Sequence, residues 1–362
     1  MRQLPPRARI FPLLVSSMLA AGCGGAASLP APGTNAPAVA AAEPRTTEAD
    51  VRAELAALAA DSMEGRYTGT PGAERAARYL AEQFRAVGLR PADDDGYFQL
   101  LPLAWEEQGP SRVFRLLNAW ADTAGIPPRR HGRGINVVGI LPGNDPALRN
   151  QVVLIDAHYD HIGTTALGEC AAQAGDTICN GADDDASGVV AVIEIAREVA
   201  RAPGPRRTIV FLATTGEEVG LLGTRWYIRH PVLPLDSTVA NLEIEMVGRP
   251  DSLAGGPGKA WLTGYERSTM GQILAAANVP IVRDPRPTQN FFERSDNIAF
   301  ARLGIPAHTL SSFNLHADYH TANDEVDRVD FAHMTAVIRA AARAGRLLAD
   351  GPAPRWNTGG KP

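Results

Sequence analysis

The sequence predicts an α/β fold, a three-layer sandwich in which a mixed, mostly parallel central β-sheet is covered by helices on both faces. Two observations predict this class. Short apolar runs rich in β-branched residues recur along the chain, as expected of buried strands. Longer segments with apolar residues at helical spacing separate these runs, and such alternation is typical of a sheet with helices packed on each side.

The expected elements follow from these patterns. An amphipathic helix is predicted over residues 72–87, because its apolar side chains recur at helical spacing and Gly88 supplies a C-cap. A second helix over 187–199 is apolar nearly all round, as expected of a helix packed on a sheet, and a third covers 331–348. Buried strands are predicted over residues 136–141, 152–155, 208–213 and 239–244.

Composition and charge narrow the class of function. The chain has 362 residues, of which 45% are hydrophobic, and a formal net charge of −5, which is a globular composition. Because no basic run with interleaved aromatic residues is present, we predict no nucleic-acid partner. We predict one catalytic domain over residues 46–350 and a disordered tail over 351–362.

The N-terminal region has the features of an export signal. Three arginines precede an apolar stretch that is too short to span a bilayer. The sequence Leu-Ala-Ala-Gly-Cys over residues 19–23 resembles the bacterial lipobox, whose cysteine is lipidated and becomes the new N-terminus. We therefore predict a signal peptide over 1–23, a membrane anchor at Cys23 and an Ala- and Pro-rich tether over 24–45. A plain secretory leader with an incidental cysteine is the alternative.

The two remaining cysteines are nine positions apart. In an exported protein facing the periplasm or the cell exterior, an oxidising environment would allow Cys170 and Cys179 to form a disulfide. Metal ligation by this pair is the alternative, although the neighbouring motifs already supply histidines and carboxylates.

Groups of ionisable residues follow the predicted strands, where the chemistry of open α/β sheets is located. The strand over 152–155 leads into His158, with the carboxylate of Asp160 two residues on; a structural histidine is the alternative. Asp183, Asp184 and Asp185 then stand among small residues before the second helix. They predict either a cation site or an acidic helix cap.

Two further strands also end in acidic residues. Glu217 and Glu218 follow the strand over 208–213 and suit a division of labour, in which one binds metal and the other transfers protons. A helix N-terminus rich in acids is the alternative. The strand over 239–244 leads to Glu245, and Glu243 lies on the same face of that strand. A last group over 315–324 holds two histidines, one of which is expected to be structural.

Taken in order, five blocks resemble the motifs of the M28 zinc peptidases: H-Y-D, G-A-D-D-D-A-S-G, G-E-E-V-G-L-L-G, E-M-V-G and Y-H-T-A-N-D. Similarity continues at residues 61–72 and 294–306, and spans about 46 to 350. The resemblance implies the zinc-exopeptidase fold and two zinc ions. It makes Asp184 the carboxylate that bridges both ions, His158 and Glu245 the further ligands of one, and Glu218 and His320 those of the other.

The same resemblance implies roles for three more residues. Glu217 would be the general base, Asp160 would orient His158, and the Tyr319 phenol would hydrogen-bond the developing oxyanion. The fourth block has Glu245 where many members have Asp, which leaves Glu243 as an alternative ligand. A second departure is Asn297, which follows Asp296 where histidine is common.

These features predict a two-zinc exopeptidase that removes N-terminal residues from peptides through a metal-activated water. A carboxypeptidase or dipeptidase of the same family, a glutaminyl-cyclase-like enzyme and a non-catalytic metal- or peptide-binding lipoprotein are the alternatives. Residues 250–292 are expected to form the wall of the substrate pocket, with an apolar site shaped by Trp261, Tyr265, Phe291 and Phe292. That these four are ordinary core aromatics is the other interpretation.

Overall fold

The computed structural model describes residues 45–93, 96–108, 111–167 and 170–362, and this part contains ten strands in one sheet and seven α-helices. The predicted signal peptide, the anchor at Cys23 and the tether, apart from Arg45, lie outside the described residues.

The strands form a mixed sheet in the order β3-β2-β4-β6-β5-β7-β10-β8-β9, with β1 paired to β4. The pairs β6–β5, β5–β7, β7–β10 and β8–β9 are parallel and the remaining pairs are antiparallel. In chain order the strands are β1 Arg90–Pro91, β2 Phe98–Gln108, β3 Ser111–Leu116, β4 His131–Leu141, β5 Val152–His158, β6 Thr208–Thr214, β7 Thr238–Glu245, β8 Ala260–Leu262, β9 Ile281–Arg283 and β10 Ala307–Ser311.

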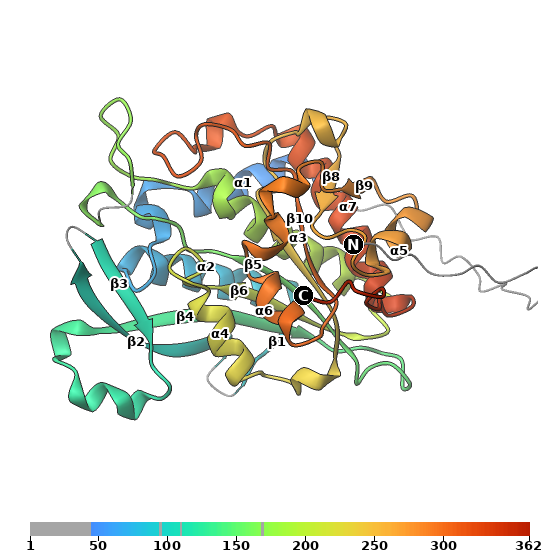
Figure 1. Cartoon of the computed structure of the whole chain (residues 1–362), viewed down its shortest axis with the longest axis horizontal. Coiled ribbons are helices and arrows are strands. Elements are labelled where there is room, and N and C mark those ends of the chain that lie inside the picture. Colours follow the sequence, from blue (N-terminus) through green and yellow to red (C-terminus); the bar gives the residue numbers. More distant parts are fainter. Residues whose placement is uncertain (1–44, 94–95, 109–110, 168–169) are drawn as a thin grey trace, which may run out of the picture. The chain divides into compact units, whose positions relative to one another are not determined.

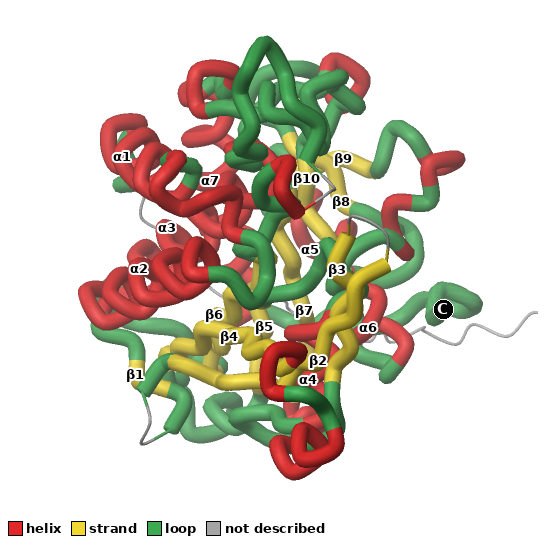
Figure 2. The backbone as a smooth tube through the Cα atoms, turned by 90° about the vertical axis from the view of Figure 1, so that its left-hand side faces the viewer, coloured by secondary structure: helices red, strands yellow, loops and turns green. Residues whose placement is uncertain are grey.

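Helices lie on both faces of this sheet, so the predicted three-layer sandwich is confirmed (Figures 1 and 2). One face packs against four long helices and the short α5, and the other packs against α4 and α6. The helices are α1 Glu48–Leu58, α2 Pro71–Val87, α3 Gly188–Ala200, α4 Leu222–Arg229, α5 Met270–Ala276, α6 Asn297–Arg302 and α7 Phe331–Asp350.

The central strands are buried on both faces, which explains why the sequence shows continuous apolar runs there. On β5, Val153 and Ile155 pack against the long helices, whereas Val152 and Leu154 pack toward α4 and α6. Because side chains alternate along a strand, each strand contributes to two hydrophobic cores. Each fully buried aliphatic side chain of this kind stabilises the fold by about 1.5–3 kcal/mol.

The α2 helix illustrates how local sequence sets the boundaries. The Thr70 hydroxyl accepts the main-chain N–H of Ala73 at 3.3 Å, and Pro71 occupies the first turn, where its missing N–H costs nothing. The helix ends at Gly88, whose φ of 86° is the left-handed conformation expected of a glycine C-cap. The predicted helix and its end are therefore confirmed.

The prediction of a disordered tail over residues 351–362 is wrong. The Trp356 indole donates to the main-chain oxygen of Gly304 at 2.8 Å, and its ring lies against Phe292 and His308. A short bridge also pairs Trp356 with Ser268. The tail is ordered because one large aromatic side chain completes the core on the α6 face of the sheet.

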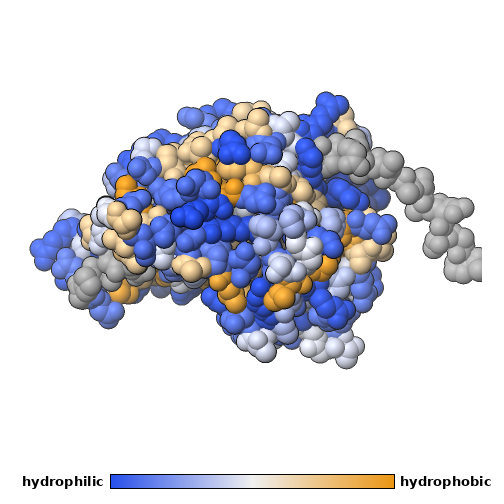
Figure 3. All heavy atoms as spheres, turned by 90° about the horizontal axis from the view of Figure 1, so that it is seen from above, coloured by the Kyte–Doolittle hydropathy of each residue, from blue (hydrophilic) through white to orange (hydrophobic). Residues whose placement is uncertain are grey.

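Two further features concern the surface and the cysteines. Cys170 and Cys179 are joined by a disulfide, as predicted. No helix among the described residues is both long and apolar enough to cross a membrane. Seen from above, hydrophobic residues lie in small groups among hydrophilic ones (Figure 3).

Candidate metal centre

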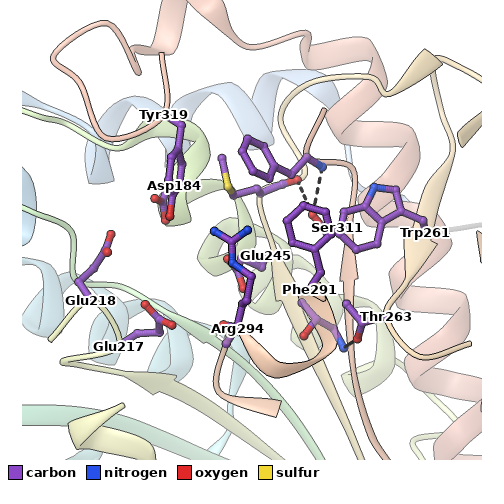
Figure 4. Close-up of a pocket in the computed structure, with 14 residues that line it drawn as sticks. Asp184, Glu217, Glu218, Glu245, Trp261, Thr263, Phe291, Arg294, Ser311 and Tyr319 are labelled. Carbon is purple, nitrogen blue, oxygen red and sulfur yellow. Dashed lines mark hydrogen bonds between the residues drawn. The ribbon is translucent and has the colours of Figure 1, made fainter. Parts of the chain in front are cut away.

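The predicted site residues converge at one edge of the sheet. Strands β6, β5 and β7 are parallel neighbours, so their carboxyl ends lie side by side. His158 ends β5, Glu217 and Glu218 follow β6, and Glu245 ends β7. Figure 4 shows three of these side chains directed toward a common space, where they meet Asp184 from the segment before α3. Ligand groups far apart in sequence thus come together because strand order brings them together.

A buried arginine fixes two of the loops that carry the site. The Arg66 guanidinium is fully buried and donates to the main-chain oxygens of Tyr159 (2.7 Å), Leu58 (3.0 Å), Asn180 (2.5 Å) and Gly181 (2.9 Å). These acceptors flank the segments of His158 and Asp184. A charged donor that satisfies four buried carbonyls is costly to remove, so Arg66 holds these two segments in register.

The three adjacent aspartates have different surroundings. One Asp183 oxygen accepts a main-chain N–H from the segment after β7 at 2.7 Å, and one Asp185 oxygen accepts the N–H of Met246 at 2.9 Å. The main-chain N–H groups of Asp183 and Asp184 in turn donate to Asp324 at 3.0–3.1 Å. The Asp184 carboxylate is left free to face the histidines.

The two oxygens of Asp184 face different histidines. Its Oδ1 lies 3.4 Å from His158 Nε2, while its Oδ2 lies 3.1 Å from His320 Nε2 and 3.7 Å from His161 Nδ1. Glu218 completes the second group, with Oε1 at 2.8 Å from His161 Nδ1 and Oε2 at 3.2 Å from His320 Nε2. Four potential ligand atoms, one from each of His161, Asp184, Glu218 and His320, lie within 4.8 Å of one another.

The acidic residues strongly perturb one another. Burial, reinforced by Glu218 and Glu245, raises the pKa of Glu217 well above its usual value. Burial and Glu243 raise the pKa of Glu245 to about 8. Burial would also raise the pKa of Glu218, but hydrogen bonds from His161 and His320 outweigh it and hold that pKa below its usual value.

The histidines respond in the opposite sense. Burial lowers the pKa of His320, yet hydrogen bonds to Asp184 and Glu218 prevail and raise it to about 10. Burial opposes the charged form of His158 as well, but the surrounding carboxylates raise its pKa well above the usual value. Protons therefore occupy these rings when nothing else neutralises the carboxylates.

A divalent cation fits this donor set. Imidazole nitrogens and carboxylate oxygens are the ligands that zinc accepts in tetrahedral sites. The structure also leaves the buried Oδ2 of Asp185 without a hydrogen-bond partner in the part of the chain it describes. A cation would replace the protons that the cluster otherwise requires, so the residues present suit a metal.

Asp160 occupies the predicted neighbourhood but contacts His158 in an unexpected way. His158 Nδ1 lies 3.1 Å from the main-chain oxygen of Asp160, whereas the carboxylate is 3.8 Å away. The carboxylate accepts instead from the Thr68 hydroxyl at 3.0 Å and from the Glu217 main-chain N–H at 3.2 Å. Asp160 therefore orients the ring through its backbone and uses its carboxylate to hold the loop of Glu217.

The alternative ligand Glu243 is already engaged in the fold. Its oxygens accept from the hydroxyls of Ser295 and Thr309 and from the main-chain N–H groups of Asp296 and Asn297. A buried carboxylate with four protein donors has no lone pair directed at the cluster. Of the two acids on β7, only Glu245 lines the cavity beside Asp184.

A cavity adjoins the carboxylates. Trp261 and Phe291 form its far wall, and Arg294 lies between that wall and the acidic side chains (Figure 4). The remaining apolar lining comes from Met246, Phe313 and Tyr319. Two of the four predicted pocket aromatics thus line the cavity. Phe292 instead packs in the core beside Trp356, and Tyr265 packs against the core under the long helices.

Tyr319 stands at the edge of the site. Its ring stacks on His320, with ring centres 3.8 Å apart. Burial and the nearby carboxylates raise the pKa of Tyr319 far above the usual value, so the phenol keeps its proton. His316 is the other histidine within residues 315–324, and its Nε2 lies 3.1 Å from Asp183. It has the structural position that was expected for one of these two histidines.

The sequence predictions did not include His161, although it directly follows the H-Y-D block and faces Glu218. Its position next to a motif could have indicated it. The loop that follows a strand can place a second histidine beside the one at the strand end. Asp324 and Arg66 were also absent from the predicted site. Arg66 and Asp324 find their partners in segments distant in sequence, which no local pattern reveals.

Comparison with known proteins agrees with this geometry. The family model described as Peptidase family M28 matches residues 136–344. A vacuolar membrane protease of Aspergillus fumigatus is 29% identical over 218 residues, which is 56% of this chain and 19% of the relative. One of Lachancea thermotolerans is 26% identical over 219 residues, 59% of this chain and 20% of the relative. The chain therefore spans about a fifth of the length of these curated relatives.

Solved structures share the fold over most of the chain. An aminopeptidase from Aneurinibacillus sp. strain AM-1 has a TM-score of 0.60 at 16% identity, covering 85% of this chain and 95% of that one. A zinc aminopeptidase from Bacillus subtilis scores 0.59 at 14% identity, covering 84% and 95%. A glutaminyl cyclase from Porphyromonas gingivalis scores 0.56 at 16% identity, covering 82% and 97%. At these identities the likeness shows the fold.

Proposed function

Because the chain belongs to peptidase family M28, we propose that it is a zinc-dependent exopeptidase that removes residues from the N-termini of peptides. The observation that carries the proposal is the convergence of His158, Asp184, Glu218, Glu245 and His320 at one sheet edge, with Glu217 beside them. Asp184 would bridge two zinc ions, because its two oxygens face different histidines.

Zinc ions bound at this site would lower the pKa of a bound water and polarise the scissile carbonyl. The protein supplies the proton transfers. Glu217 lines the cavity beside Asp184 and Glu218, where its carboxylate would accept a proton from water and return it to the leaving amine. The Tyr319 phenol, which keeps its proton, would donate a hydrogen bond to the developing oxyanion.

The cavity gives the proposal its substrate class. Aromatic and apolar side chains on one side, and the carboxylates on the other, would place an apolar substrate side chain against Trp261 and Phe291 while its peptide bond faces Glu217.

A peptide panel tests the proposal directly. The purified protein would be incubated with matched peptides bearing free or acetylated N-termini, with and without chelator, and the products identified by mass spectrometry. We expect stepwise loss of single residues from free N-termini only, abolished by chelator and restored by zinc. Removal of C-terminal residues, or cleavage of dipeptides alone, would contradict the aminopeptidase assignment; cyclisation of an N-terminal glutamine would indicate the cyclase chemistry named for one structural neighbour.

We also propose that the protein is exported and anchored through Cys23. The Cys170–Cys179 disulfide supports export, because such bonds persist in oxidising compartments. Growth of an expressing bacterium with a labelled fatty acid should label the wild-type chain and not Cys23→Ala. Labelling of both, or of neither, would contradict the anchor.

A further inference from the structure

We infer that His161 is a fourth protein ligand of the metal held by Asp184, Glu218 and His320. This half of the centre would then be closed by protein donors, and the half of His158 and Glu245 would be the one open to substrate. The inference rests on the proposed two-metal function and specifies how the two halves differ.

The His161 ring is held rigidly beside the cluster. The residue is fully buried, and Nδ1 is the ring nitrogen that faces the carboxylates, at 2.8 Å from Glu218. Its Nε2 is buried and has no hydrogen-bond partner within the described ranges. On its other side the ring lies against Gly181, where an added Cβ would come within 2.5 Å of two ring atoms. Only glycine leaves room for the ring, so its position is fixed.

The spacing of the donor atoms matches a tetrahedral site. Zinc bonds of about 2.0–2.1 Å separate neighbouring tetrahedral ligands by about 3.3 Å. The distances from His161 Nδ1 are 2.8 Å to Glu218 and 3.7 Å to Asp184. Those from His320 Nε2 are 3.1 Å to Asp184 Oδ2 and 3.2 Å to Glu218 Oε2, whereas His161 faces Glu218 Oε1. Each distance is within about half an ångström of the tetrahedral separation, and one atom from each of the four residues can be chosen so that all four lie within 4.8 Å of one another.

The two halves differ in their number of protein donors. Asp184 Oδ2 faces two histidines, whereas Oδ1 faces His158 alone at 3.4 Å. With His158, Asp184 and Glu245, the first half has three protein donors. Zinc sites with four protein ligands are typically structural, and those with three keep an open position for a water or substrate. The difference in ligand number therefore assigns different tasks to the halves.

Hydrogen bonding is the competing explanation, because Nδ1–H of His161 could simply orient Glu218. Two near-isosteric substitutions separate these roles. Asn places an N–H donor where Nδ1 stands but is a poor zinc ligand, whereas Asp places a ligand oxygen there and donates nothing. The two explanations therefore predict opposite results for His161→Asn and His161→Asp.

The test measures zinc per chain by mass spectrometry after dialysis against graded chelator, with circular dichroism to establish folding. We expect wild-type and His161→Asp protein to retain two zinc ions at a chelator strength that leaves His161→Asn with one. The zinc affinity of His161→Asn should fall by more than the 10–100-fold that outer hydrogen-bond partners contribute. His333→Asn, which alters a buried histidine bonded to Ser312 and Gly258, should match the wild type.

Retention of both ions by His161→Asn, with loss from His161→Asp, would overturn the inference and leave His161 a positioning residue. A wild-type chain that binds a single zinc, lost in His161→Asn, would contradict the two-metal function while supporting His161 as a ligand. The zinc content of the wild type therefore tests the two-metal function, and the zinc content of the two variants tests His161 as a ligand.

Discussion

Two glutamates on one strand, Glu243 and Glu245, have the same chemistry and opposite surroundings. Four protein donors satisfy Glu243, which is fully buried and does not line the cavity. Glu245 lines the cavity, where its neighbours include Asp184 and Glu217. A carboxylate whose lone pairs are filled by the fold is structural. Carboxylates that face one another require a cation, and this difference separates Glu245 from Glu243.

The same contrast applies to the histidines. The buried ring of His308 lies 2.7 Å from the Thr263 carbonyl through Nδ1 and 2.7 Å from the Ser268 hydroxyl through Nε2, so both nitrogens have partners. His161 has one nitrogen against a carboxylate and the other without a partner among the described residues. Because both ring nitrogens of His308 are engaged by the fold, that ring has no nitrogen left for a metal, whereas Nδ1 of His161 faces the carboxylates of Glu218 and Asp184.

The largest expected effect follows from removing the general base. Glu217→Gln should lower kcat by about 10²–10⁴-fold, because the amide cannot accept the proton from water. Zinc content should stay at the wild-type value, since Glu217 is not among the proposed ligands. Steady-state kinetics and metal analysis on one sample check both points; a variant within tenfold of wild-type kcat would remove Glu217 from this role.

The two strand glutamates should separate metal binding from stability. Glu245→Gln should lose one zinc ion or bind it at least about 100-fold more weakly, because it removes a proposed ligand. Glu243→Gln should keep both ions and lose about 1–3 kcal/mol of unfolding free energy, since its amide leaves donors unpaired. Zinc analysis and urea unfolding of both variants check this; metal loss confined to Glu243→Gln would reverse the assignment.

The disulfide should have an intermediate effect on stability. Cys170→Ser with Cys179→Ser removes a cross-link between residues nine positions apart, which should cost about 2–3 kcal/mol in unfolding free energy. The bridged segment also contacts the loop of His320, because Ala171 pairs with Thr321. Thermal unfolding of the double variant at fixed zinc measures the cost. An unchanged melting temperature would mean that the bridge does not constrain the chain.

The smallest effect concerns pH and the structural histidine. Burial lowers the pKa of His308 from 6.5 to about 4, so the unfolded chain binds a proton that the folded chain does not. The unfolding free energy is not reduced by this group above pH 6.5 and falls as the pH is lowered toward 4. The loss amounts to about 2 kcal/mol at pH 5. Urea unfolding from pH 7 to 5 should show a flatter profile for His308→Gln than for wild type. Parallel profiles would disprove this origin.

The sequence predicted those parts of the fold that depend on periodicity. The buried strands β4 to β7 and the helices α2, α3 and α7 have patterns that repeat every two or 3.6 residues. The β2–β3 hairpin was not predicted, because Pro102 stands within β2 and a proline argues against a strand. The ordered tail was missed because Trp356 finds its partners in distant elements.

The candidate centre was predicted to a similar extent. The order and spacing of the motifs identified His158, Asp184, Glu218 and His320 as residues that meet at one edge of the sheet. The choice between Glu243 and Glu245 needed three-dimensional structure, because strand alternation puts both on one face and only their neighbours differ. His161 was missed because a histidine that follows a motif block has no distinct periodicity of its own.

The most direct test of the account is a zinc titration of metal-free protein, in which bound metal and release of single residues from free N-termini are measured together. We expect two zinc ions per chain, no hydrolysis without metal and full recovery of hydrolysis as the sites fill. Undiminished hydrolysis by protein that contains no metal would contradict this expectation, because the buried carboxylates would then act without the cation that their arrangement requires.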